Sequence, residues 1–291
     1  MNYFITGASG FIGRRLVEKL LQRQDSTVYY LILERELPMV EVLRQRWGQH
    51  ADRTVPIVGD LTQPRLGVSD SDLARLKGGV DHLFHLAAIY DFKASAEVQE
   101  KVNIQGTRNV VAFAEAIEAG CFHLTSSIAA AGLYEGVFRE DMFEEAEELG
   151  NPYYRTKHES EGIVRRECSR PWRVYRPGIV VGDSRTGEMD KIDGPYYFFK
   201  LIQKVRNLLP PWMPMIGLEG GRLNLVPVNF IVDAMDHIAH QPDLNGQCFH
   251  LVDPKPHRVG DILNLFARAG HAPEMTLRVN ALMFAFVPQI I

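Results

Sequence analysis

Cysteine is scarce in this sequence, and no pair of cysteines has the spacing of a metal or redox motif. The 291 residues include three cysteines, an odd number, and no CxxC occurs. This pattern argues against a disulfide framework and against a zinc ribbon, and it fits a reducing compartment. We therefore expect a cytoplasmic protein whose functional site holds no metal.

Long apolar runs and a strong charge of one sign are also missing. The first residues, MNYFITGASG, lack the basic and apolar segments of a signal peptide. The longest late apolar stretch, 281–287, is far too short to span a bilayer, so no transmembrane segment is predicted. The 32 Lys and Arg residues against 36 Asp and Glu residues give a net charge of −4, which argues against nucleic acid as a partner.

What the sequence does have is a regular alternation of short apolar strands and amphipathic helices. Over the first 180 residues, predicted strands such as Asn2–Thr6 and Thr27–Leu33 alternate with predicted helices such as Phe11–Gln24 and Pro152–Glu167. This order predicts a parallel sheet covered on both faces, with ligands bound at the carboxyl ends of the strands. We therefore predict an α/β protein with a Rossmann-type doubly wound parallel sheet.

A glycine-rich turn joins the first predicted strand to the first predicted helix. Gly7 can make the tight turn, Gly10 lets the backbone approach a pyrophosphate, and Gly13 lets the helix pack against the strand. The N–H groups and the dipole at the start of the helix attract the same anion. The turn thus predicts a dinucleotide site, whose further contacts here are Ser9, Phe11 and Ile12.

Other segments fall where a dinucleotide needs them. Asp60 follows the third predicted strand, where it could accept a hydrogen bond from the adenine amino group. After the second strand, an acidic residue would bind the ribose 2′-hydroxyl of NAD and an arginine the 2′-phosphate of NADP. Glu34 and Arg35 stand there together and support either cofactor, and Arg14 is a second possible phosphate ligand. The remaining predicted cofactor contacts are Leu61, Leu86, Ala87, Ala88, Thr125, Tyr153, Lys157, Pro177, Gly178 and Ile179.

Tyr153 and Lys157 form a YxxxK pair on the predicted helix 152–167, downstream of Ser127 at a strand end. The i,i+4 spacing places both side chains on one face of the helix. An ammonium nearby favours phenolate and so lowers the pKa of a tyrosine from its usual value of about 10. This predicts that Tyr153 donates a proton to a carbonyl oxygen, which Ser127 would hydrogen-bond.

Two further residues bear on this prediction. Asn103, on a long helix predicted from about 94 to 119, could hold a water that refills the proton relay. A second YxxxK match, from Tyr196 to Lys200, has no serine at a preceding strand end. We interpret Tyr196 as a packing residue.

The alternation of strands and helices breaks off after residue 177, which predicts a second, smaller part. We predict that residues 1–177, completed by about 224–252, form the NAD(P)-binding domain. Residues 178–223 and 253–291 would form a smaller C-terminal substrate-binding lobe. Its predicted helix Tyr196–Leu209 carries apolar and basic residues, which suit core packing, an acyl channel or peripheral contact with a membrane.

In their order, these motifs resemble those of the extended short-chain dehydrogenase/reductases. Longer strings, including SSIAAAGLYEGVFREDMF and YYRTKHESE, are similar to the N-terminal reductase module of bacterial alcohol-forming fatty acyl-CoA reductases. The resemblance implies NADPH-dependent reduction of a fatty acyl-CoA or a long-chain fatty aldehyde to a fatty alcohol. The serine, tyrosine and lysine of that family fall on Ser127, Tyr153 and Lys157. Its members commonly have an arginine near the position of Leu33, and this departure leaves NADH open as the cofactor.

The resemblance also leaves other interpretations open. Such enzymes often carry a second reductase module, and the apolar residues 284–291 suggest that this chain has the length of one module. A sugar-nucleotide epimerase or dehydratase and a hydroxysteroid dehydrogenase are alternatives within the superfamily. A non-catalytic, dinucleotide-sensing protein is an alternative of another class, against which Tyr153 counts.

Overall fold

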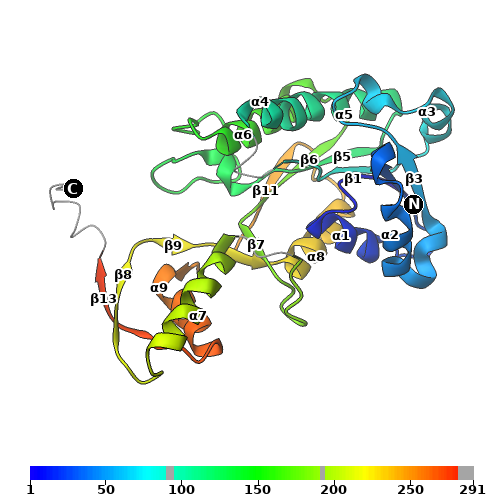
Figure 1. Ribbon diagram of the computed structural model, residues 1–291. Helices are drawn as coiled ribbons and strands as arrows, with labels where there is room; N and C mark the ends of the chain where they lie inside the picture. The colour runs from blue at the N-terminus through cyan, green and yellow to red at the C-terminus, as the bar shows by residue number, and fades with distance from the viewer. Residues whose placement is uncertain (90–94, 191–193, 281–291) are drawn as a thin grey trace. The chain divides into compact units, whose positions relative to one another are not determined.

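A computed structural model describes residues 1–89, 95–190 and 194–280 (Figure 1). The apolar stretches 281–287 and 284–291 lie outside the described residues. The chain divides into two compact units. Unit 1 is Met1–Gly178 with Val228–Leu251, and unit 2 is Ile179–Pro227 with Val252–Ile291.

A seven-stranded sheet forms the centre of unit 1, in the order β11-β6-β5-β4-β1-β2-β3. All of its strand pairs are parallel. This sheet confirms the predicted Rossmann-type fold, in which the reversal of strand order beside β1 opens a ligand crevice. Its strands are β1 (Asn2–Thr6), β2 (Thr27–Ile32), β3 (Thr54–Val58), β4 (His82–His85), β5 (Cys121–Thr125), β6 (Trp172–Pro177) and β11 (Gln247–Leu251).

Helices cover both faces of this sheet (Figure 1). One face carries α1 (Phe11–Leu20), α2 (Met39–Trp47) and α8 (Val228–Ala239), and the other carries α3 (Asp70–Leu76), α4 (Ala96–Gln99), α5 (Gly106–Ala116) and α6 (Pro152–Glu167). Between α5 and the sheet, the rings of Phe4 and Phe113 lie 4.8 Å apart in a fully buried cluster. Burial of apolar area at about 25 cal/mol per Å² holds these layers together. Short helical turns connect them: η1 (Glu34–Glu36), η2 (Gly48–Arg53), η3 (Pro64–Gly67) and η5 (Ile128–Ala131).

The helix predicted from about 94 to 119 is present as an unbroken helical run from Ala96 to Ala116, but its middle is not α-helical. Between α4 and α5 the chain forms a π-helical segment, η4 (Glu100–Gln105). Within this segment, the carbonyl oxygen of Asn103 accepts hydrogen bonds from the hydroxyls of Thr107 at 2.6 Å and Ser160 at 2.9 Å. These hydroxyls compete with the backbone N–H that would donate to the Asn103 carbonyl in a regular α-helix. Insertions of this type often mark functional sites.

Unit 2 is built from short strand pairs and two helices. Its strand pairs are β7 (Ile179–Val181) with β10 (Leu225–Pro227), β9 (Arg222–Leu223) with β12 (His257–Arg258), and β8 (Met215–Glu219) with β13 (Met275–Asn280). Helix α7 (Phe198–Leu208) follows the turn η6 (Gly194–Tyr197) and contacts α9 (Val259–Ala269), where the rings of Phe199 and Phe266 lie 5.0 Å apart. Sequence analysis missed β8 because its partner, β13, lies far along the chain.

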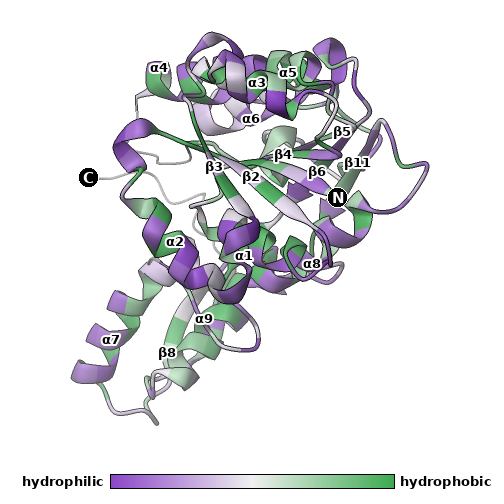
Figure 2. Ribbon diagram, turned by 90° about the vertical axis from the view of Figure 1, so that its right-hand side faces the viewer, coloured by the Kyte–Doolittle hydropathy of each residue, from purple (hydrophilic) through white to green (hydrophobic). Residues whose placement is uncertain are grey.

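Helix α7 buries no residue completely, and Figure 2 shows hydrophilic and hydrophobic residues alternating along it. Its exposed apolar side chains include Phe198, Leu201 and Leu208. Packing through Phe199 accounts for one part of its apolar surface, while acyl-chain and membrane contact stay predictions. Among the described residues, none of the helices combines the length and the apolar character needed to cross a bilayer.

Candidate active site

The glycine turn between β1 and α1 is shaped by close backbone contacts. Gly7 has a φ of +77°, and a Cβ on it would lie 2.7 Å from the backbone nitrogen of Ala87. A Cβ on Gly13 would lie 2.0 Å from the carbonyl oxygen of Gly7. Only glycine fits either position, because L-residues rarely adopt this φ and real Cβ atoms do not approach so closely. The turn is therefore a cradle of bare backbone.

The start of α1 adds the electrostatics that an anion needs. Gly10 precedes the helix in an extended conformation, and the N–H of Arg14 donates to its carbonyl at 3.1 Å, the first bond of the helix. The N–H groups of Phe11, Ile12 and Gly13 thus have no acceptor within the helix. Ser9 is exposed beside them. Free N–H groups and the positive end of the dipole suit a pyrophosphate, so these residues fit a dinucleotide.

The ends of β4 and β3 are fixed close to the same edge of the sheet. The backbone N–H of Leu86 donates to the Thr6 carbonyl at 3.2 Å, and that of Ala87 donates to Thr6 Oγ1 at 3.3 Å. Asp60 Oδ1 accepts from the N–H and the hydroxyl of Thr62 at 2.8 and 2.9 Å. Its Oδ2 has no hydrogen-bond partner within the described part of the chain. The Leu61 carbonyl accepts from Asn109 Nδ2 at 2.7 Å, which fixes this loop.

Three side chains would choose between NAD and NADP, and two of them lie at the surface. Glu34 and Arg35 lie in η1, directly after β2, and both are exposed. Among the described residues, neither side chain has an ion-pair partner. Arg14 is half-buried on α1, where its carbonyl accepts from Trp47 Nε1 at 3.3 Å. The geometry thus leaves both the acidic and the basic group available to a ribose.

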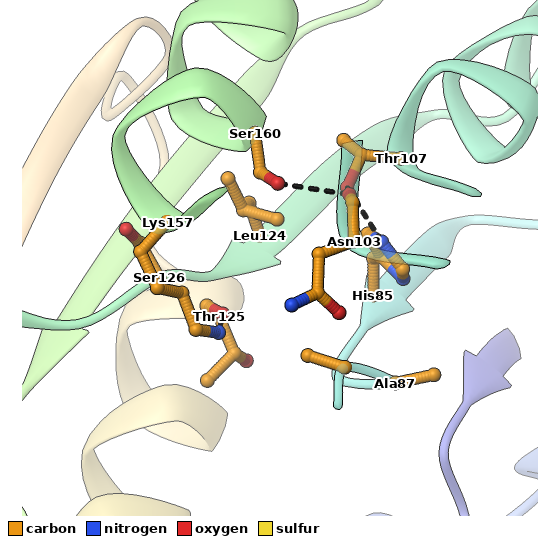
Figure 3. Close-up of a pocket in the computed structure, with 10 residues that line it drawn as sticks. His85, Ala87, Asn103, Thr107, Leu124, Thr125, Ser126, Lys157 and Ser160 are labelled. Atoms are coloured by element: carbon orange, nitrogen blue, oxygen red, sulfur yellow. Dashed lines mark hydrogen bonds between the residues drawn. The ribbon is translucent and has the colours of Figure 1, made fainter. Parts of the chain in front are cut away.

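Tyr153 and Lys157 lie one turn apart on α6. The helix starts at Pro152, and Asn151 caps it by accepting from the Tyr153 N–H at 2.9 Å. Lys157 Nζ donates to the Thr125 carbonyl at 3.2 Å and so ties the helix to the end of β5 (Figure 3). Burial lowers the pKa of Lys157 from 10.5 to about 8.

Ser127 follows β5 in an extended conformation and begins η5. Its Oγ accepts a hydrogen bond from the Ala129 N–H at 3.1 Å, and its side chain is half-buried. Because a hydroxyl can accept and donate at the same time, the Ser127 proton is still available to a substrate oxygen. Ser127, Tyr153 and Lys157 therefore come from segments that meet at the end of β5.

Asn103 uses its carboxamide to hold the backbone after β4. Its Oδ1 accepts from the Ile89 N–H and its Nδ2 donates to the Ile89 carbonyl, both at 2.8 Å. Nδ2 also lies 3.3 Å from Thr156 Oγ1 on α6. The side chain thus links η4, the β4 loop and α6, and its role in a proton relay stays a prediction.

A small cavity lies between these residues, and Figure 3 shows the side chains around it. Its space corresponds to about one water molecule. It is lined by His85, Ala87, Ala88, Asn103, Thr107, Leu124, Thr125, Ser126, Lys157 and Ser160.

Sequence analysis missed a buried imidazole and a buried ion pair beside this site. His85 lies between Thr6 Oγ1 at 2.7 Å and Thr107 Oγ1 at 3.1 Å, and burial together with nearby Lys157 lowers its pKa to about 3. Glu161, one turn after Lys157, pairs with Arg176 at the end of β6. The sequence does hold an indication of this pair, because Glu161 and Arg176 are charged residues at positions that the fold buries.

The last predicted contacts fall at the boundary between the units. Gly178, which follows Pro177, donates its N–H to the Leu251 carbonyl at 3.1 Å within unit 1. Ile179 donates its N–H to the Asn224 carbonyl at 2.8 Å within unit 2. In unit 2, the Tyr196 hydroxyl accepts from the Gly182 N–H at 3.0 Å and its ring contacts Phe266, so Tyr196 packs as predicted.

Comparison with known proteins shows what the chain as a whole is similar to. The family model described as Male sterility protein matches residues 5–235. Among solved structures, the terminal R domain of the myxalamid PKS-NRPS biosynthetic pathway is similar, with a TM-score of 0.80 and 28% identity. The match covers 96% of this chain and 71% of that one.

Curated proteins of two kinds are also similar. A linear gramicidin synthase protein of Brevibacillus parabrevis is 29% identical over 91% of this chain and 5% of its own length. A Drosophila melanogaster protein whose name describes a fatty acyl-CoA reductase is 27% identical over 100% of this chain and 70% of its own. This chain spans only 5% to 28% of the first three curated proteins that it matches.

Proposed function

Because the chain belongs to the Male sterility protein family and is an NAD(P)H-dependent oxidoreductase of the extended short-chain type, we propose that it reduces a fatty acyl-CoA or a long-chain fatty aldehyde with NADPH. The observation that supports the proposal is that Lys157 ties α6, which also carries Tyr153, to the end of β5, directly before Ser127 and in the same unit as the glycine cradle. Similarity to a fatty acyl-CoA reductase supports the substrate class.

In this proposal the glycine cradle and the N–H groups of α1 hold the pyrophosphate, and Asp60 accepts from the adenine. The 2′-phosphate is bound by Arg35 or Arg14, and NADH stays open as the alternative. NADPH supplies the hydride for the carbonyl carbon when bound. Lys157 and Tyr153 would hold the nicotinamide ribose.

The protein's own groups then act on the carbonyl oxygen. Ser127 donates a hydrogen bond to the oxygen on which charge develops, and Tyr153 donates the proton. The Lys157 ammonium favours the tyrosinate that results. Reduction of a thioester releases a thiol and an aldehyde, and a second reduction of the aldehyde gives the alcohol. A second reductase module elsewhere in the native protein would share these two steps.

A thioester attached to a peptide synthetase is a second candidate substrate. Similarity to the R domain and to the gramicidin synthase favours it. The fatty acyl-CoA and the synthetase-bound substrate share a thioester carbonyl, and they differ in what bears the thiol.

Oxidation of NADPH and NADH by the purified protein tests the proposal. Palmitoyl-CoA, decanal and an N-acetylcysteamine thioester are compared side by side, with the alcohol product measured by gas chromatography. We expect NADPH consumption with the acyl-CoA or the aldehyde. Activity with the short thioester alone would favour the synthetase-type substrate, and binding of NADPH without turnover of any carbonyl would revive the dinucleotide-sensing alternative.

A further inference from the structure

One face of the central sheet carries two imidazoles and a thiol at the start of β4 and β5. His82 begins β4, Cys121 begins β5 as its partner in the parallel register, and His123 follows two residues later. Leu83 and Phe122, one residue further along each strand, point to the opposite face and into the apolar cluster there. Cys121 and His123 are buried, and His82 is half-buried. Because polar groups inside a packed layer are costly without partners, this cluster calls for an explanation.

The three side chains are close enough to share one ion. Each offers one ligand atom, an imidazole nitrogen or the thiol sulfur, and these atoms all lie within 4.8 Å of one another. His82 Nδ1 and His123 Nε2 are 2.9 Å apart and share a hydrogen bond. Around a tetrahedral zinc ion, with Zn–N bonds of about 2.1 Å and Zn–S bonds of about 2.3 Å, neighbouring ligand atoms are about 3.4–3.6 Å apart. Small rotations of the side chains are therefore enough to place an ion where the two histidines now share a proton.

The surroundings keep both imidazoles in the form that binds a metal. Burial lowers the pKa of His82 to about 4 and the pKa of His123 well below its usual value, so both rings are neutral at pH 7 and each has a lone pair. His123 Nδ1 lies 3.0 Å from the Tyr175 hydroxyl. This nitrogen can donate its N–H to Tyr175 while Nε2 faces the ion, and metal-bound histidines almost always have such an outer partner.

Cys121 can supply the negative charge that the ion needs. Burial raises the pKa of its thiol to about 11, and Arg173 acts in the opposite direction. Its only printed contact in the described chain is a weak one, from Sγ to the Phe122 carbonyl at 3.9 Å. A coordinating metal removes the thiol proton, and the thiolate offsets the repulsion between the ion and Arg173. Thiolate and imidazole together suit zinc and other soft or borderline metals, whereas magnesium and calcium prefer oxygen ligands.

We propose that His82, Cys121 and His123 form a binding site for one soft or borderline transition-metal ion such as Zn²⁺. Two neutral imidazoles and one thiolate bind the ion, and a water on the side of the half-buried His82 completes a tetrahedron. Binding releases one proton, from the Cys121 thiol. The proton that the histidines share moves to an outer ring nitrogen, and no group is oxidised or reduced.

This metal site is separate from the candidate active site. His82 begins β4, whereas His85 ends it and lines the cavity beside Lys157, three residues or about 10 Å further along the strand. The glycine cradle also lies at the carboxyl ends of the strands. The ion would thus join β4 to β5 at their amino ends without contact to the reacting atoms, and the inference does not rest on the proposed function.

Titration of the wild-type protein with Co²⁺ tests the site without any variant. The protein carries no affinity tag and is first treated with a chelator, and Co²⁺ stands in for Zn²⁺ because its spectrum reports its ligands. We expect one Co²⁺ per chain, a near-ultraviolet charge-transfer band from a cobalt–thiolate bond, and the intense visible bands of four-coordinate Co²⁺. Excess Zn²⁺ should remove both features. A saturated sample without the charge-transfer band would overturn the proposal.

Two cysteine variants then identify the thiolate. Cys121→Ser should abolish the charge-transfer band and raise the Kd for Zn²⁺ at least about 100-fold, since loss of even an outer partner costs 10- to 100-fold. Cys168→Ser is the matched control, because the half-buried Cys168 donates to the Arg170 carbonyl at 3.7 Å and lies outside the cluster. It should bind Zn²⁺ like wild type. Equal affinity for Zn²⁺ in Cys121→Ser and wild type would overturn the assignment.

Thermal unfolding gives an independent measure of the same site. Zn²⁺ at about 100 times its Kd should raise the Tm of the wild-type protein by about 5 °C, because the ion binds the folded chain only. The same concentration should raise the Tm of Cys168→Ser equally and leave that of Cys121→Ser unchanged. An equal rise in all three proteins would show that Zn²⁺ binds elsewhere, and it would contradict the proposal.

Discussion

Arg176 and Glu161 form an ion pair that is closed off from solvent. Arg176 Nη2 lies 2.6 Å from Glu161 Oε1, and the two side chains are 1% and 0% exposed. Glu161 Oε2 also accepts from the Ser126 hydroxyl at 3.0 Å, directly before Ser127. Burial raises the pKa of Glu161, but Arg176 and Arg165 outweigh it and hold that pKa below its usual value. The pair thus joins α6, β6 and the end of β5.

Removal of this buried charge should destabilise the fold strongly. We expect Glu161→Gln to lower the free energy of unfolding by about 3–5 kcal/mol, because it leaves Arg176 buried without an anion. Glu167→Gln is the matched control, since Glu167 pairs with Arg108 where both side chains are exposed, and it should cost less than about 1 kcal/mol. Urea unfolding measures both variants, and equal losses would contradict this account.

The glycine cradle gives a second prediction. Gly7→Ala should destabilise the protein and abolish NADPH binding, because its Cβ would collide with the Ala87 backbone at a φ of +77°. Gly78→Ala is the control, since Gly78 has a φ of +67° with nothing within 4 Å of its Cβ position. Gly78→Ala should lower the free energy of unfolding by about 1 kcal/mol through backbone strain alone, and the variant should still bind NADPH. Tight NADPH binding by Gly7→Ala, measured by fluorescence titration, would refute the cradle.

Acid should destabilise the protein through histidines that are buried or half-buried. Burial is the main cause that lowers the pKa of His82 to about 4, and it also lowers the pKa of His123, to which His82 is hydrogen-bonded at 2.9 Å. In the unfolded chain the pKa of histidine is about 6.5, so below that pH the unfolded state binds more protons than the folded state. The free energy of unfolding therefore has its full value above about pH 6.5 and falls as the pH drops toward 4. Each such histidine adds up to about 1.4 kcal/mol per pH unit to this slope.

His82→Asn should therefore reduce the slope of unfolding free energy against pH, measured by urea unfolding from pH 7.5 to 4. The exposed His257 gives the control, because His257→Asn should leave the slope unchanged. An unaltered slope in His82→Asn would show that this imidazole is not the group that titrates.

Cofactor preference should depend on Arg35. We expect Arg35→Ala to raise KM for NADPH about tenfold and to leave KM for NADH nearly unchanged, because only NADPH has a 2′-phosphate for the guanidinium to bind. Arg258→Ala, an exposed arginine of unit 2, is the control. If Arg35→Ala changes the KM for NADPH and the KM for NADH equally, the 2′-phosphate is bound elsewhere, and Arg14 is the next candidate.

The strands, the glycine turn and the YxxxK helix could be predicted because their signals are local. Apolar runs, glycine spacing and an i,i+4 pair each occupy fewer than about 20 residues. The π-helical form of η4 has no such local signal, and one of the hydroxyls that bond to the Asn103 carbonyl belongs to Ser160, 57 residues further along the chain. The burial of Glu161 is likewise decided by Arg176, on another element. Sequence alone gave no reason to assign the carboxamide of Asn103 to Ile89.

Steady-state turnover of Tyr153→Phe tests the central claim most directly. NADPH oxidation with palmitoyl-CoA and decanal is measured alongside NADPH binding, with the neighbouring Tyr154→Phe as the matched control. Loss of the phenolic proton donor should lower kcat by at least about 100-fold while the Kd for NADPH stays near that of wild type. Tyr154→Phe should keep most of its activity. Turnover by Tyr153→Phe at the wild-type rate would contradict the proposed mechanism.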